Sequence, residues 1–271
     1  MDFTSHAAIR LADDIEAAAS ADLYAAAAST LGLRVEHVDG ATVLLAPRIP
    51  VNYFNRVIGL GGHDRATERG LDTIIDLFRT AGVADFWLHV TPAARPTELS
   101  DWLGARGLRP PPRRSWAKFL RAPTEVALRA TAGLEVRLAT AADAAEVGRT
   151  ATTAFGMPPQ LGHWFASLIG REGWQVLVAE VDGRIAGTGS VFVRDRTAWV
   201  GIGATLPEFR KRGAQTALLA ARIAAAKAAG CTVVATETGE SISGEPNTSL
   251  ANIRRAGFTQ VCSRLNFASK V

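Results

Sequence analysis

The sequence predicts an α+β fold that is built from two copies of one structural unit. Short segments with alternating apolar residues, which are typical of strands, are separated by segments with the apolar spacing of helices. One order of elements also occurs twice: a strand, a helix, a glycine and a second strand lie over 57–90 and again over 200–236. A duplicated α+β unit is therefore expected.

The elements of the first copy are predicted from their local patterns. A long helix is expected over 9–31, followed by a hairpin that turns at Asp39-Gly40, a dipeptide suited to a two-residue turn. The chain then continues with an apolar segment over 51–61, a helix over 66–81, a strand over 85–90, a helix over 96–105 and a strand over 114–121.

The second copy begins after a proline cluster and a glycine, which predict a boundary near residues 122–133 and domains over 1–125 and 132–271. Asp182-Gly183 predicts a hairpin turn, and Gly230 and Gly257 end helices. The expected elements are a strand over 134–140, a helix over 141–155, a second helix containing 161–168, strands over 174–181, 184–195 and 197–206, a helix over 215–229, a strand over 231–238, a short helix over 247–256 and a strand over 259–267.

The composition is that of an ordinary globular protein, since 48% of the residues are hydrophobic. No apolar run reaches the roughly 18 residues of a membrane-spanning helix and no signal peptide is evident, so a cytoplasmic protein with no membrane partner is expected. The net charge of +4 and the pI near 9.5 suit an anionic ligand or a nucleic acid. Cys231 and Cys262 lack the spacing of a zinc site, so no metal is expected, and buried reduced thiols are favoured over a disulfide.

A basic stretch precedes the helix over 215–229. Arg210, Lys211 and Arg212 lie where this helix begins, although the positive end of the helix dipole disfavours cations. The first backbone N–H groups of a helix have no partner within it, and Gly213 lets a ligand approach the backbone closely. The stretch therefore predicts a site for phosphate or pyrophosphate, with the cations neutralising the anion. A solvated basic turn is the alternative, because R-x-x-G is a short pattern.

The segment 204–215 is similar to the Q/R-x-x-G-x-G/A motif of the GNAT superfamily of acetyl-CoA-dependent N-acetyltransferases. Arg210 and Gly213 match the motif, while Gln215 replaces its last glycine or alanine. The resemblance covers 134–271 and implies a mixed, mostly antiparallel sheet flanked by helices, with a splayed central pair of strands. It implies that the pyrophosphate and pantetheine arm of coenzyme A contact Gly203, Ala204, Thr205, Arg210, Lys211, Arg212, Gly213, Ala214, Gln215 and Thr216.

A second segment, 247–258, is similar to the family's N-x-x-S signature that ends in Gly-Phe. Ser249 keeps the usual distance to that pair, whereas Asn247 lies one residue closer to it, so that Asn252 is a substitute for the asparagine contact with coenzyme A. Ile253 stands where many family members carry the tyrosine that protonates the leaving thiolate, so this general acid is absent. The first half shares only the order of elements and has no R-x-x-G before its helix over 66–81. It is expected to be a degenerate copy that does not bind coenzyme A.

Acetyl transfer to an amine requires the amine to be deprotonated. Glu237, at the end of the strand over 231–238, is the first candidate for the base, and an exposed loop carboxylate is the alternative. Glu180 is a weaker candidate, and a histidine such as His163 is more often a packing or surface residue. The residues that could line an apolar acceptor pocket, or else belong to the core, are Phe155, Met157, Pro158, Trp164 and Phe165.

These observations predict an enzyme with tandem GNAT-like domains that transfers the acetyl group of acetyl-CoA to a primary amine by direct attack. The acceptor is a small molecule or a peptide, its identity is open, and the chain is a monomer or a homodimer. A non-catalytic acyl-CoA-binding or regulatory protein is the alternative, because Ile253 occupies the acid position. A nucleic-acid-binding protein is suggested only by the basic pI, and no nucleic acid partner is expected.

Overall fold

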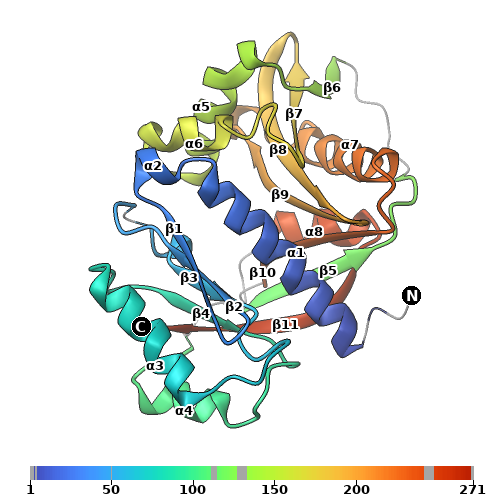
Figure 1. Cartoon of the computed structure of the whole chain (residues 1–271). Coiled ribbons are helices and arrows are strands. Elements are labelled where there is room, and N and C mark those ends of the chain that lie inside the picture. The colour runs from blue at the N-terminus through green and yellow to red at the C-terminus, as the bar shows by residue number, and fades with distance from the viewer. Residues whose placement is uncertain are drawn as a thin grey trace. The chain divides into compact units, whose positions relative to one another are not determined.

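The computed structural model describes residues 3, 5–49, 51–110, 115–126, 133–240 and 247–269. The chain forms two compact units (Figure 1). The first comprises Met1–Phe119, Glu237–Leu250 and Gln260–Val271, and the second comprises Leu120–Thr236 and Ala251–Thr259. Each unit is mixed α/β, as the sequence predicts.

In the first unit, helices pack on a mixed sheet with the strand order β1-β2-β3-β4-β11-β5. The pairs β1/β2, β2/β3 and β4/β11 are antiparallel, and β3/β4 is parallel. The core lies where the apolar face of the sheet meets α3 and α4, and it includes Leu71, Ile74 and Phe78. The elements are α1 (His6–Ala25), α2 (Ala28–Leu31), β1 (Arg34–Val38), β2 (Ala41–Leu45), a 3-10 turn (Asn52–Phe54), β3 (Arg56–Ile58), α3 (Glu68–Thr80), β4 (Trp87–Val90), α4 (Leu99–Ala105), β5 (Trp116–Arg121) and β11 (Thr259–Ala268).

The second unit has the strand order β10-β9-β8-β7-β6, in which only β9 and β10 are parallel. Helices α5 and α7 pack on β8 and β9. The elements are β6 (Leu134–Leu138), a 3-10 turn (Ala141–Asp143), α5 (Ala144–Phe155), a 3-10 turn (Pro159–Leu161), α6 (Gly162–Ala166), β7 (Trp174–Val181), β8 (Arg184–Arg194), β9 (Thr197–Thr205), a 3-10 turn (Pro207–Phe209), α7 (Ala214–Ala228), β10 (Val233–Gly239) and α8 (Thr248–Arg255).

The last strand, β11, lies within the sheet of the first unit. It pairs antiparallel with β4 from Leu265, opposite Val90, to Ala268, opposite Trp87. In the strand order it stands between β4 and β5, so the first unit contains segments from both ends of the chain. The predicted domains 1–125 and 132–271 are contiguous in sequence, and that division stays a prediction. The predicted boundary near 122–133 includes residues 127–132, which lie outside the described residues.

Most predicted elements are present, with one correction in the first half. The predicted helix over 9–31 is two helices, because the chain turns at Ala26 and Ala27, and Ala27 leaves the helical region at φ −136°. The sequence carries no glycine or proline at this turn. The hairpins at Asp39-Gly40 and Asp182-Gly183 form as predicted, with positive φ at all four residues. Among the described residues, no helix has the length and apolar character needed to cross a membrane.

Candidate functional site

The start of α7 forms an open backbone cradle in the second unit. Lys211 and Gly213 both have left-handed backbones, at φ 64° and 85°, and no side chain caps the helix. The first hydrogen bond of the helix runs from the N–H of Ala217 to the carbonyl of Gly213, so the preceding N–H groups of the helix are not used within it. Gly213 is exposed. This geometry suits an anion held by backbone N–H groups.

Three exposed cations surround the cradle, as the sequence predicts. Arg210, Lys211 and Arg212 are exposed. Arg212 donates to the carboxylate of Asp182 at 2.9 Å, and its guanidinium lies 5.8 Å from the ring centre of Phe209. These contacts hold Arg212 on the surface beside the helix start. The positive charge of the three residues favours a ligand with several negative charges.

The strand that leads to the cradle carries a bulge. Thr188 of β8 faces Ala204 of β9, and Ser190 faces Gly201, so β9 holds one more residue than β8 between these pairs. The extra length places Ile202 at φ 52°. Along its other edge, β9 pairs with β10 only over Thr197–Trp199. The backbone of Gly203, Ala204 and Thr205 therefore lies beyond the paired part of the two parallel strands, which is the splayed pair that the family resemblance implies.

Helix α8 is joined to the start of α7 through side-chain amides. Asn252 donates to the side-chain carbonyl of Gln215 and accepts a hydrogen bond from Arg255 at 2.6 Å. Its predicted contact with coenzyme A stays a prediction, and in this structure its amide orients Gln215, the residue that departs from the family motif. Ile253, at the position of the family's tyrosine, is 5% exposed. Ala214 is buried, and Thr216 is half-buried.

Asn247 and Ser249 belong to the first unit. Asn247 accepts a hydrogen bond from the N–H of Leu250 at 3.0 Å and donates to the carbonyl of Gly239. This arrangement caps the start of α8 and ties it to the end of β10. Ser249 is half-buried on the same helix. Their predicted contacts with coenzyme A stay predictions.

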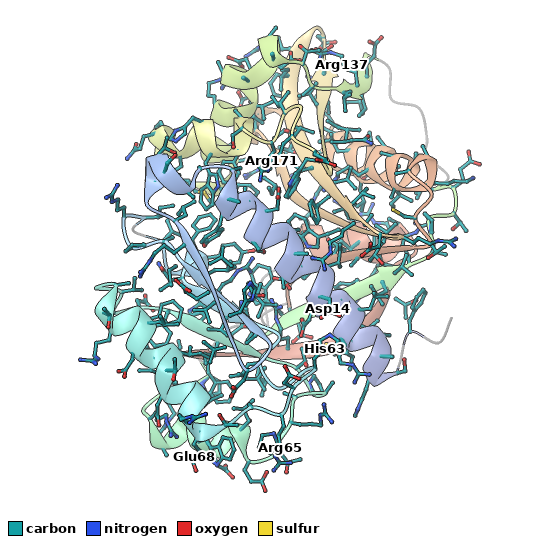
Figure 2. The ribbon with its side chains drawn as sticks, viewed as in Figure 1. Asp14, His63, Arg65, Glu68, Arg137 and Arg171 are labelled. Atoms are coloured by element: carbon teal, nitrogen blue, oxygen red, sulfur yellow. The ribbon has the colours of Figure 1, made fainter. Side chains whose placement is uncertain are left out.

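Glu237, the first candidate for the general base, lies in the first unit at the end of β10 and is half-buried. Burial lowers the pKa of Lys118, but Asp13, Glu16 and Glu237 outweigh this effect and raise it. Glu237 is therefore close to cations rather than an isolated loop carboxylate. The weaker candidate, Glu180, is bound to Arg137 at 2.5 Å in the second unit, at the edge that Figure 2 marks with Arg137.

Lys118 is part of a buried charge cluster in the first unit. Glu16 is completely buried, and its carboxylate binds Lys118 at 2.5 Å, Arg264 at 2.6 Å and Arg56 at 3.1 Å. Asp13 binds Lys118 at 2.9 Å. Burial alone would raise the pKa of Glu16, but the three cations hold it well below its usual range. This cluster was not predicted from the sequence, although Glu16 occupies the apolar stripe of α1 and so signals a buried acid.

His89 of β4 faces the same cluster. Burial lowers its pKa, and the charges of Arg264 and Arg56 lower it further, while Glu16 and a 2.6 Å hydrogen bond with Asn266 act in the opposite direction. The pKa in the folded protein is well below the ordinary value of about 6.5. The imidazole is therefore neutral when the protein is folded at neutral pH.

We expect the folded protein to lose stability as the pH falls below about 6.5, because the unfolded chain then takes up a proton at His89 that the folded chain does not. The measurement is the free energy of unfolding in urea at several pH values between 7.5 and 5. A His89→Gln variant should show a flatter pH dependence over this range than the parent protein. Equal slopes for the two proteins would contradict the buried, neutral histidine.

Of the other residues singled out from the sequence, some are buried and others are exposed. Trp164 and Phe165 are buried and their rings stack at 5.7 Å, so they belong to the core rather than to an open acceptor pocket. Phe155 is 43% exposed, and His163 is exposed. Cys231 and Cys262 are buried and not joined in a disulfide, and burial raises the pKa of the Cys262 thiol to about 11.

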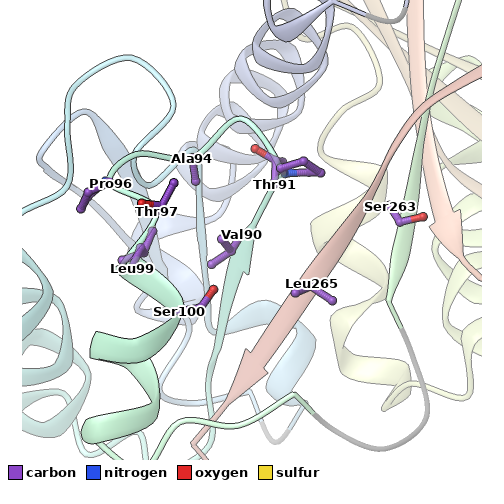
Figure 3. A pocket seen from close by; sticks show the side chains of 10 residues that line it. Val90, Thr91, Ala94, Pro96, Thr97, Leu99, Ser100, Ser263 and Leu265 are labelled. Atoms are coloured by element: carbon purple, nitrogen blue, oxygen red, sulfur yellow. The ribbon is translucent and has the colours of Figure 1, made fainter.

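A pocket of about 320 Å³ opens in the first unit, at the end of β4 and the start of α4 (Figure 3). Val90, Thr91, Leu99 and Ser100 line one part of it, and Leu265 of β11 lines another. None of the sequence-predicted site residues lines this pocket. No group of three or more metal-ligating side chains occurs within the described part of the chain.

Known proteins resemble this chain in sequence and in fold. Residues 148–243, which include the bulge and the cradle, match the acetyltransferase (GNAT) family. No curated protein matches the chain. A GCN5-related N-acetyltransferase from Kribbella flavida aligns over 96% of both chains with a TM-score of 0.65 and 16% identity. A GCN5-related N-acetyltransferase from Sphaerobacter thermophilus covers 84% of this chain and 79% of its own, with a TM-score of 0.60 and 19% identity.

A third solved structure is a tandem GNAT protein from the clavulanic acid biosynthesis pathway, which covers 84% of this chain and 77% of its own with a TM-score of 0.59 and 16% identity. These likenesses define the class of fold: tandem GNAT-like domains, as the sequence predicts. With the family match over 148–243, they confirm the resemblance to the GNAT superfamily.

Proposed function

We propose that the protein is an enzyme that transfers the acetyl group of acetyl-CoA to a primary amine by direct attack. The observation that supports it most is the uncapped start of α7, with its left-handed Gly213 and three exposed cations directly after the bulged strand β9. Backbone N–H groups, a helix dipole and cations together suit a pyrophosphate. The acetyltransferase family match supplies the reaction class.

The residues of the second unit fit coenzyme A in two places. The amides of Lys211, Arg212, Gly213, Ala214, Gln215 and Thr216 would bind the pyrophosphate, with Arg210 and its neighbouring cations neutralising its charge. Gly203, Ala204 and Thr205 offer an unpaired strand edge to the pantetheine arm, whose amides bind as an added strand does. When bound, acetyl-CoA supplies the activated thioester carbonyl.

The chain's own contributions to the chemistry are proton handling and positioning. Glu237 is the proposed base for the acceptor amine. The acceptor is a small molecule or a peptide with an amino group. A family tyrosine is absent at Ile253, which is buried, so the departing thiolate would take its proton from another donor, such as the ammonium formed on the acceptor.

A non-catalytic acyl-CoA-binding protein is a second candidate, favoured by Ile253 at the acid position. Both candidates predict ligand binding, and only the first predicts turnover. Calorimetric titration of the protein with acetyl-CoA and with coenzyme A at moderate salt, followed by a screen of amines for coenzyme A release, separates them. Saturable binding at one site per chain, with release of coenzyme A that depends on an amine, is expected. No binding up to millimolar ligand would overturn both candidates.

A further inference from the structure

A buried cation lies beneath the bulged strand of the second unit. Arg222 of α7 is 4% exposed. Its Nη1 donates to the carbonyl of Gly201 at 3.0 Å, and its Nε donates to the carbonyl of Leu218 at 3.1 Å. In the part of the chain that the structure describes, no carboxylate lies within ion-pair distance of this guanidinium, and burial lowers the pKa of Arg222 to about 10. Among the described residues, the hydrogen-bond acceptors of this buried positive charge are therefore backbone carbonyls.

Two glycines on neighbouring strands make room for this guanidinium. A Cβ atom added to Gly189 of β8 would lie 2.9 Å from the Nε of Arg222, and one added to Gly203 of β9 would lie 3.1 Å from its Nη2. Neither glycine has a left-handed φ, so their backbones do not require glycine. A side chain at either position would instead push the guanidinium out of its present place. The two glycines therefore let Arg222 occupy this buried position, where burying its charge is costly.

The hydrogen bond from Arg222 to Gly201 reaches the part of β9 that departs from a regular strand. Gly201 precedes Ile202, the bulge residue at φ 52°, and the pairing of β9 with β10 has already ended at Trp199. Beyond the end of its pairing with β10, β9 keeps its antiparallel pairing with β8, where Gly201 faces Ser190, and the carbonyl of Gly201 accepts the hydrogen bond from the guanidinium. The exposed Gly203 follows two residues later.

We propose that Arg222 is a positioning residue, which acts through the carbonyl of Gly201 to hold the bulge of β9 in the shape that receives the acyl-pantetheine arm. This inference rests on the proposed function, because it requires coenzyme A to bind along β9. It assigns a role to a residue of α7 distant from the cradle. The pyrophosphate site at the helix start is separate and does not depend on Arg222.

The test compares two ligands by calorimetry. Acetyl-CoA carries the pantetheine arm, whereas 3′-phospho-ADP carries the pyrophosphate without the arm. An Arg222→Met variant is expected to bind acetyl-CoA about tenfold more weakly, the usual effect of losing a charge-assisted hydrogen bond, while its affinity for 3′-phospho-ADP stays unchanged. Lys227→Met, which removes an exposed cation from the same helix, is the matched control and should bind both ligands as the parent does.

A second variant keeps the test decisive if Arg222→Met folds poorly. Gly189→Ala, on β8 and outside the proposed pantetheine edge, keeps Arg222 but puts a methyl group 2.9 Å from its Nε, so the guanidinium must shift, and we expect the same selective loss of acetyl-CoA affinity. If the parent protein binds no acetyl-CoA, the proposed function itself fails. If the parent binds it and both variants retain its affinity, or lose both ligands in parallel, the positioning role of Arg222 is overturned.

Discussion

A Gly213→Glu variant is expected to bind acetyl-CoA at least about a hundredfold more weakly than the parent protein. The new carboxylate would stand at the start of α7, where the proposed pyrophosphate binds, and like charges placed together cost several kcal/mol. Gly213 is exposed and has a left-handed backbone at φ 85°, so the added side chain has no core to disturb. The affinity is measured by calorimetric titration.

Gly230→Glu is the matched control, because it introduces the same strain at the other end of the same helix. Gly230 has φ 76°, and an added Cβ atom there meets nothing within 4 Å. The backbone strain should cost both variants a comparable amount of stability, on the order of 1–2 kcal/mol for a non-glycine residue in this region. Only Gly213→Glu should lose affinity. Unchanged binding in Gly213→Glu would show that the cofactor site lies elsewhere.

Glu16→Gln should cause the largest loss of stability, with a free energy of unfolding lower by about 3 to 5 kcal/mol, as expected when one partner of a buried ion pair is removed. The substitution keeps the size of the side chain and removes its charge. It leaves Lys118, Arg264 and Arg56 buried, with the carboxylate of Asp13 still in contact with Lys118 and Arg264. Urea unfolding at pH 7.5 measures the loss.

Asp14→Asn is the control for this substitution, because Asp14 is the adjacent acid of α1. It pairs with His63 (Figure 2). About half of each side chain is exposed, so the change should be below about 1 kcal/mol. The two variants should also differ in acid. The pKa of Glu16 is depressed in the folded protein, so its contribution is present above about pH 4.5 and is lost as the pH falls below that value. Equal losses from both variants at pH 7.5 would contradict the charge cluster.

Local patterns were sufficient to predict most elements and the uncapped helix start with its three cations at α7. The start of α7 follows from Gly213 and the cations before it, because backbone N–H groups and charge depend on sequence neighbours. The bulge at Ile202 has a weaker signal, since Gly201 and Gly203 flank it but two glycines in a strand also fit a plain strand. The buried contact of Arg222 could not be predicted, because it depends on glycines of two other elements.

The pairing partner of strand β11 could not be predicted from the sequence. Its alternating pattern predicts a strand, but nothing in 259–268 indicates that its partner is β4, which lies far back in the sequence. The same applies to the charge cluster, whose members come from α1, β3, β5 and β11. Pairing over such distances is decided by the fold as a whole, so Lys118 and Arg264 appear in the sequence as ordinary charges.

The place of β11 between β4 and β5 bears on how the protein is made. During synthesis, the residues of β1 to β5 leave the ribosome long before those of β11. Until β11 is made, the edges of β4 and β5 that pair with it have no partner strand. Open strand edges of this kind pair readily with other chains. The first sheet is therefore complete only once β11, the strand between β4 and β5, has been made.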